Sequence, residues 1–133
     1  MRVFVTGATG LLGSNVVTVA AGEFGAEVVG TVHRTKPSKI LPCVLEPVDI
    51  TDREAVLKAI KKHKPNLVVH CAALVDAPFL EKHRELGWRV FVEGTENVAK
   101  ACREVGGAKL IFVSTDWIFD GRNPPYNEKS MPS

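Results

Sequence analysis

The sequence lacks three features that would point to particular classes of protein. Its three cysteines are odd in number and lack the paired spacing of a zinc site or disulfide framework, so we expect reduced thiols, a cytoplasmic protein and no metal. The formal net charge is only +2, which leaves no basic surface for nucleic acid. No apolar run approaches the roughly 20 residues that cross a bilayer, and Met1 leads directly into a predicted strand, so we expect neither a membrane span nor a signal peptide.

The remaining composition is that of one soluble globular domain. Hydrophobic residues make up 45% of the 133 residues and charged residues 24%, which is enough apolar material for a core. This length predicts a single domain over residues 1–133, small for an enzyme that must also hold a second substrate.

Short apolar runs alternate with segments of helical spacing along the chain. The runs predict strands at 3–5, 27–32, 43–45 with Val48, 67–71 and 110–113. Between them, Leu12, Val16, Val19 and Ala20 share helical spacing, and Thr51 with Glu54 forms a predicted capping box. A longer helical stretch with Val90, Val98, Ala101, Cys102 and Val105 on one face ends at Gly106.

This alternation predicts an α/β fold with a doubly wound, Rossmann-like parallel sheet of about five strands. Strands that are apolar nearly throughout are typical of a parallel sheet covered on both faces. Right-handed crossovers and a ligand loop after the first strand give the expected strand order 3-2-1-4-5. Residues 116–133 are expected to form a mostly irregular tail.

The first loop has the glycine spacing of a dinucleotide-binding turn. Gly7 is expected to make the tight turn, Gly10 to admit a pyrophosphate, and Gly13 to let the helix pack closely. The alternative is an ordinary strand-turn-helix connection with incidental glycines. The candidate cofactor-binding residues of this loop are Gly7, Thr9, Gly10, Leu11, Leu12 and Gly13.

The end of the second predicted strand indicates which dinucleotide is bound. No Asp or Glu stands where an NAD-preferring site places an acid for the ribose 2′-hydroxyl, whereas His33 and Arg34 do follow the strand. A guanidinium suits a 2′-phosphate, and Lys36 and Lys39 add positive potential, so we expect NADP(H) to be preferred. The alternative is a solvated basic loop.

Two further strand ends contribute candidate cofactor contacts. Asp49, followed by Ile50, can accept a hydrogen bond from an adenine amino group, or it can be a helix-entry residue. Cys71, Ala72 and Ala73 follow the fourth predicted strand, and the two alanines are small enough for backbone to lie against a cofactor. The preceding residue, His70, is interpreted as a packed strand-end histidine rather than a catalyst.

Three segments together resemble the extended short-chain dehydrogenase/reductases. They are Thr6–Gly13, His70–Ala73, and Ser114–Gly121 with Pro125–Glu128, of which the last is the most specific. Within this family the chain is most similar to the dTDP-4-dehydrorhamnose reductase branch. The regulatory β subunit of methionine adenosyltransferase, which binds NADP and a partner protein, resembles the same segments.

The resemblance implies hydride transfer between NADPH and a keto-sugar nucleotide, assisted by a Ser/Thr, a Tyr and a Lys. Thr115 matches the first of these and is the candidate catalytic residue, with a hydroxyl that would hydrogen-bond the substrate carbonyl. The alternative is that Ser114 and Thr115 only end a strand and satisfy the following turn.

The chain also departs from the family pattern. The Tyr-x-x-x-Lys pair is absent: the only tyrosine, Tyr126, is followed by Lys129 at three positions rather than four. Phe91 stands where many relatives have an asparagine. We therefore expect the cofactor-binding part of a reductase, ending before the catalytic helix, that binds a dinucleotide without turning over a nucleotide sugar. A non-catalytic NADP-binding regulatory subunit is the alternative, and the oligomeric state, a homo-oligomer included, stays open.

Overall fold

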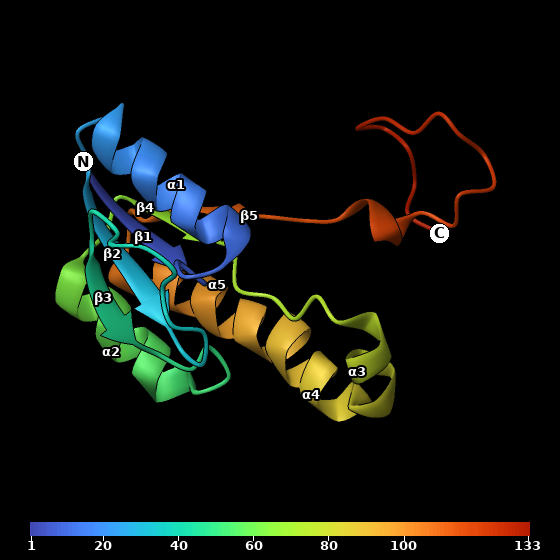
Figure 1. Ribbon diagram of the computed structural model, residues 1–133, viewed down its shortest axis with the longest axis horizontal. Coiled ribbons are helices and arrows are strands. Elements are labelled where there is room, and N and C mark those ends of the chain that lie inside the picture. The colour runs from blue at the N-terminus through green and yellow to red at the C-terminus, as the bar shows by residue number, and fades with distance from the viewer.

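A computed structural model describes all residues, 1–133, and places five parallel strands in one sheet (Figure 1). The order β3-β2-β1-β4-β5 confirms the predicted doubly wound arrangement. In the sheet, Val3 of β1 pairs with Val28 of β2 on one side and with Leu67 of β4 on the other. The strands are β1 (Arg2–Thr6), β2 (Glu27–Val32), β3 (Val44–Pro47), β4 (Leu67–His70) and β5 (Lys109–Phe112).

Helices cover the two faces of the sheet unequally. Helix α1 lies on one face, and α2 and α5 lie side by side on the other (Figure 1). The helical segments are α1 (Leu11–Gly22), α2 (Arg53–His63), α3 (Ala77–Lys82), α4 (Arg84–Trp88), the π-helical η1 (Arg89–Gly94), α5 (Thr95–Val105) and the 3₁₀ turn η2 (Asp116–Ile118).

Alternate residues of the central strands pack into two separate hydrophobic cores, one on each face of the sheet. Phe4 and Val68 point toward α2 and α5, where they pack with Ile60 and Val98. Val3, Val5 and Val69 point the other way and pack with Val17 of α1. This alternation is why the strands are apolar nearly throughout, since both faces of each central strand are buried.

The apolar stripe predicted for α1 is only partly buried. Gly13 and Val17 are buried, and the partly buried Val16 and Ala20 pack against the same core, whereas Leu12 is 47% exposed and Val19 42% exposed. Leu12 and Val19 instead line an apolar groove of about 430 Å³ beside Leu67 and Val69. The helix forms where the spacing predicts it, and part of its apolar stripe stays exposed because no helix of the chain covers the β4 side of this face.

The capping box predicted at Thr51 and Glu54 is wrong by one residue. Asp52 is the N-cap of α2, and its carboxylate accepts a hydrogen bond from the Ala55 backbone N–H at 3.0 Å. Thr51 bonds to Asp49 instead, through both its backbone N–H and its hydroxyl. An aspartate caps a helix as well as a threonine does, so residue type alone does not separate the two registers.

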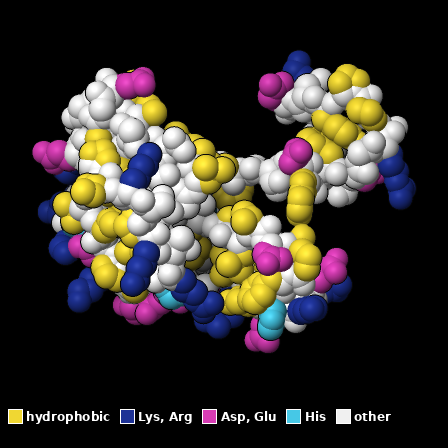
Figure 2. Space-filling view, viewed as in Figure 1, with side chains coloured by type: hydrophobic (Ala, Val, Ile, Leu, Met, Phe, Trp, Pro, Cys, Tyr) yellow, Lys and Arg dark blue, Asp and Glu magenta, His cyan; other side chains and the backbone are white.

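The helical stretch after β4 is interrupted rather than continuous. A short α3 ends at Lys82, α4 begins after His83, and η1 joins α4 to α5 through a π-helical turn. The face predicted farther along is confirmed, because Val98, Ala101 and Cys102 of α5 are buried. Beyond β5, only η2 is regular, and the C-terminal segment forms a separate lobe joined to the body by a narrow connection (Figure 2).

None of the helices is both long and apolar enough to span a bilayer. Cys43, Cys71 and Cys102 are all free thiols, and burial raises the pKa of each.

Candidate nucleotide-binding site

The glycine loop lies where the carboxyl end of β1 meets the end of β4. Gly7 has φ of +64°, a left-handed conformation that favours glycine, and an added Cβ would lie 2.8 Å from Ala72 Cα. An added Cβ at Gly13 would lie only 2.1 Å from Gly7 O, so the first turn of α1 packs directly on the loop. Both glycines are therefore required by close backbone approach, as the motif predicts.

The amino end of α1 is open at this loop. Gly10 is its N-cap and supplies no side-chain hydrogen bond, and no acidic residue stands in the first turn. The first N–H groups of a helix have no intrahelical partner, and the helix dipole is positive at this end. These N–H groups can therefore hydrogen-bond an anionic group such as a phosphate.

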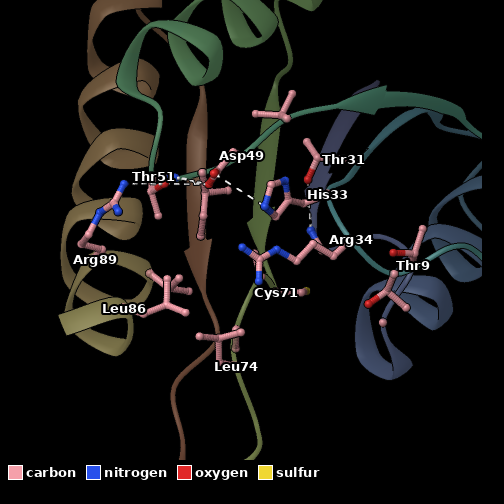
Figure 3. A pocket seen from close by; sticks show the side chains of 18 residues that line it. Thr9, Thr31, His33, Arg34, Asp49, Thr51, Cys71, Leu74, Leu86 and Arg89 are labelled. Carbon is pink, nitrogen blue, oxygen red and sulfur yellow. Dashed lines mark hydrogen bonds and ion pairs between the residues drawn. The ribbon is translucent and has the colours of Figure 1, made fainter. Parts of the chain in front are cut away.

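A pocket of about 270 Å³ opens beside the loop, at the carboxyl ends of β1 to β4 (Figure 3). In Figure 3, Thr9 lies at one side of the pocket and Arg89 at the opposite side, with Arg34 between them. The predicted cofactor-binding residues that line it are Gly7, Thr9, Gly10, His33, Arg34, Asp49, Ile50, Cys71, Ala72 and Ala73. Segments as far apart in the sequence as the glycine loop at Gly7 and the η1 turn at Arg89 thus meet at one cavity.

Three residues of the predicted loop site lie outside the pocket lining. Gly13 is buried against Gly7, Leu11 is 88% exposed, and Leu12 lines the apolar groove on the other side of α1. For Leu11 and Leu12, only the backbone N–H groups at the amino end of α1 are placed to serve a ligand in this pocket.

Asp49 lies in a network of donors at the far end of the pocket. Its carboxylate accepts from Thr51 N–H at 2.9 Å and from Thr51 Oγ1 at 2.8 Å, and it lies 3.6 Å from His33 Nε2. Burial alone would raise the pKa of Asp49, but the Thr51 hydrogen bonds and the charges of His33 and Arg89 hold it below its usual value. Asp49 therefore lines the pocket as an ionised acceptor and also orders the turn before α2.

Sequence reasoning missed several pocket residues that come from other elements. Thr31 accepts a hydrogen bond from Gly7 N–H at 3.1 Å and so ties β2 to the glycine loop. Arg89 reaches the pocket from η1, where one guanidinium nitrogen lies 3.4 Å from Thr51 Oγ1. Neither residue belongs to a local motif. A helical arginine 40 positions after Asp49 carries no sequence signal that it will face that carboxylate.

His70 is packed beneath the pocket rather than lining it, as predicted. It is 2% exposed, and burial lowers its pKa from 6.5 to about 4. Its two ring nitrogens lie within hydrogen-bond distance of Thr6 and Thr95.

Thr115 is not brought to the pocket. It is exposed, and its hydroxyl accepts from Trp117 N–H at 3.2 Å, which caps the turn η2. Tyr126 lies in the same C-terminal segment, where it stacks on Phe119 and bonds to Asp120 at 3.1 Å. The predicted catalytic residue and the predicted cofactor residues are therefore separated in this structure.

The whole chain, residues 1–133, matches the family described as the RmlD substrate binding domain. The chain belongs to this family. Among curated proteins, it is 38% identical over 132 residues to methionine adenosyltransferase 2 subunit beta of Danio rerio, which covers 99% of this chain and 38% of that protein. It is also 38% identical over 131 residues to the probable low-salt glycan biosynthesis reductase Agl14 of Haloferax volcanii, covering 97% of this chain and 42% of that protein. The RmlD-domain chain thus spans about two fifths of the length of these relatives.

Solved structures agree with the family assignment. A hypothetical dTDP-4-dehydrorhamnose reductase from Sulfolobus tokodaii superposes with a TM-score of 0.82 at 26% identity, over 100% of this chain and 46% of that one. UDP-glucose 4-epimerase of Thermus thermophilus, solved in complex with NAD, superposes with a TM-score of 0.79 at 32% identity, over 86% of this chain and 38% of that one. The RmlD-domain chain therefore has a reductase- and epimerase-like dinucleotide-binding fold.

Proposed function

We propose that this chain is the NADP(H)-binding part of a reductase that acts on a keto-sugar nucleotide. The observation that carries the proposal is that Arg34, at the end of β2, lines the same pocket as the glycine loop. A guanidinium at that strand end suits the 2′-phosphate of NADP, where an acid would suit the 2′-hydroxyl of NAD. The family and the reductases among the relatives support the reaction class.

The pocket residues divide among the parts of the dinucleotide. The turn from Gly7 to Gly10 and the amino end of α1 would hold the pyrophosphate, and Arg34 would hold the 2′-phosphate. Asp49 would accept from the adenine amino group, with Ile50 beside the ring. Bound NADPH would supply the hydride, and the backbone of Cys71, Ala72 and Ala73, which line the pocket at the end of β4, would lie against the cofactor.

Thr115 would orient the substrate carbonyl in the complete reaction. In this chain it lies outside the pocket, and no Tyr-x-x-x-Lys pair accompanies it. Orientation without a proton donor leaves the developing alkoxide poorly stabilised, which costs about 10²–10⁴-fold in rate from the lost acid catalysis alone. We therefore propose that this chain binds the dinucleotide but does not by itself turn over a nucleotide sugar.

Calorimetric titration of NADPH and NADH tests the cofactor assignment. The unmodified chain should bind NADPH more tightly, and Arg34→Asp should reverse the order because a carboxylate repels the 2′-phosphate and accepts from a 2′-hydroxyl. Lys39→Asp makes the same change of charge outside the pocket lining and should keep the original order. Equal affinities of the unmodified chain for NADPH and NADH would show that Arg34 does not determine a preference between them.

A second candidate function is a non-catalytic NADP-binding regulatory subunit. The observation that favours it is the 36% to 39% identity to methionine adenosyltransferase 2 subunit beta from several vertebrates. Incubation with NADPH and dTDP-4-dehydro-6-deoxy-L-mannose, followed by absorbance, separates the candidates when applied to the natural full-length protein. Turnover identifies a reductase, and cofactor binding without turnover favours the regulatory subunit. The free thiols fit a reducing, cytoplasmic location for either.

A further inference from the structure

The Thr6 hydroxyl lies at the centre of a buried hydrogen-bond cluster below the pocket. The backbone N–H groups of Cys71 and Ala72 both donate to Thr6 Oγ1, each at 3.1 Å. Thr6 Oγ1 also lies 2.7 Å from His70 Nδ1, and His70 Nε2 lies 3.1 Å from Thr95 Oγ1. Thr6 is 1% exposed, so solvent does not compete for these bonds.

The donors and acceptors of this cluster can be paired in one way. A hydroxyl oxygen has two acceptor sites and one proton, and the two backbone N–H groups occupy both acceptor sites of Thr6. Its proton must therefore be donated to His70 Nδ1, which must be unprotonated. A neutral imidazole then carries its proton on Nε2, from which it donates to Thr95 Oγ1.

The backbone that Thr6 holds is the backbone on which the glycine loop rests. Gly7 follows Thr6 directly, and an added Cβ on Gly7 would lie 2.8 Å from Ala72 Cα and 2.9 Å from Ala72 N. A shift of Ala72 by a few tenths of an ångström would therefore displace Gly7 or open a gap beside it. The position of the turn depends on how firmly the end of β4 is held.

We infer that His70, as the neutral tautomer protonated on Nε2, is a positioning residue that orients the Thr6 hydroxyl and so fixes the Cys71–Ala72 backbone against the Gly7 turn. Thr95 completes the arrangement from α5 by accepting the Nε2 proton. The cluster thus connects the helix on one face of the sheet to the loop that serves the pocket. The expected effect of this cluster on NADPH affinity rests on the proposed function. The expected His70 tautomer and the expected protection of the Cys71–Ala72 backbone do not.

Three substitutions separate positioning from simple packing. His70→Phe keeps an aromatic ring but gives Thr6 no acceptor, and NADPH should bind about tenfold more weakly, a change of about 1.4 kcal/mol that is in the range of one lost hydrogen bond. His70→Asn restores an acceptor near the place of Nδ1, and its affinity should return to within about threefold of the unmodified chain. Thr18→Val is the control, because it removes a hydroxyl bonded to Ser14 O on the exposed side of α1, and it should change nothing.

Amide hydrogen exchange measures the same effect without a cofactor. The Cys71 and Ala72 amides should exchange faster in His70→Phe than in the unmodified chain, and His70→Asn should return them toward the original rate. If His70→Phe exchanges no faster than the unmodified chain, the ring acts only by filling space and the inference is wrong. If His70→Asn exchanges as fast as His70→Phe, restoring an acceptor for Thr6 does not hold the backbone, and the inference is wrong as well.

The tautomer itself can be read from the imidazole nitrogen shifts in ¹⁵N-labelled unmodified chain near neutral pH. A protonated Nε2 and an unprotonated Nδ1 are expected. The reverse pattern would overturn the inference even if every variant folded. If the unmodified chain binds no NADPH, the proposed function fails, and the exchange and tautomer results still decide the role of His70.

Discussion

The two halves of the proposed reaction site are built in different ways. At the ends of β1 and β4, Thr6 and His70 are buried and bond across 64 positions of sequence. In the segment after β5, Trp117 is 75% exposed, and side-chain hydrogen bonds there join residues no more than six apart, as from Tyr126 to Asp120. The first half is stabilised by contacts between distant strands of the sheet, and the second half is stabilised by contacts within its own short segment.

This difference separates the proposed cofactor pocket from Thr115, the candidate catalytic residue. The pocket beside the glycine loop is assembled by strand register, so its geometry depends on the stability of the whole fold. Thr115 depends only on the local turn η2, and nothing in the chain packs it toward the pocket. Changes to the two halves should therefore have unequal effects.

The largest effect is expected from Gly13→Val. The added Cβ would lie 2.1 Å from Gly7 O and 2.8 Å from Gly7 C, and backbone cannot yield as a flexible side chain can. We expect a loss of about 3 kcal/mol or more in the free energy of unfolding, measured by urea titration. Gly22→Val at the other end of α1, where an added Cβ meets nothing within 4 Å, is the control and should cost much less. Equal costs would show that the loop does not pack as described.

The buried half should also respond to pH through His70. Burial lowers its folded pKa from 6.5 to about 4, so between these values the unfolded chain binds a proton that the folded chain does not. Stability from this residue is therefore fully present above pH 6.5 and is lost as the pH falls toward 4. We expect about 2 kcal/mol less stability at about pH 4.5 than at about pH 7.

The matched variant for this pH effect is His70→Asn, which has no titrating ring. Thr6, Thr95 and Phe112, the residues that His70 contacts in β1, α5 and β5, carry no charge. Carboxylates with lowered pKa values, such as Asp49, titrate in both proteins, so the difference between the two urea titrations isolates His70. A pH dependence that is identical in the two proteins would mean that His70 titrates normally.

Gly10→Val should abolish dinucleotide binding and leave the fold intact. Gly10 has an extended conformation that valine adopts, and its added Cβ would meet only Gly7 O, at 3.4 Å. The side chain would nevertheless occupy space beside the pyrophosphate position, so we expect affinity to fall at least about tenfold. Circular dichroism and calorimetric titration separate fold from binding. Undiminished binding would place the dinucleotide elsewhere.

The smallest effect is expected from Thr115→Val. The residue is exposed and lies outside the pocket, so NADPH affinity should stay within about twofold and stability within about 0.5 kcal/mol. The measurements are calorimetry and urea titration of this chain. A large loss of affinity would show that the C-terminal segment folds onto the pocket when the cofactor binds. The contrast between the two halves would then hold only for the chain without cofactor.

The sequence alone determined where the strands lie along the chain and the place of the ligand loop. Both depend on patterns a few residues long: apolar runs that predict strands, and glycines at a strand-to-helix turn. Even β3, bracketed by prolines, was predicted, and its edge position accounts for Pro47 in a strand that pairs on one side only. Local spacing was sufficient because each of these features is set within a few residues of chain.

Only the tertiary structure decided which distant side chains meet. That Thr31 accepts from Gly7, that Arg89 faces Asp49, and that Thr6 bonds to His70 all follow from strand register and helix packing, which no local pattern records. The same reason explains why α1 buries Val17 and leaves Val19 exposed. A periodic pattern indicates an apolar stripe, but the packing of elements on the sheet decides how much of that stripe is buried.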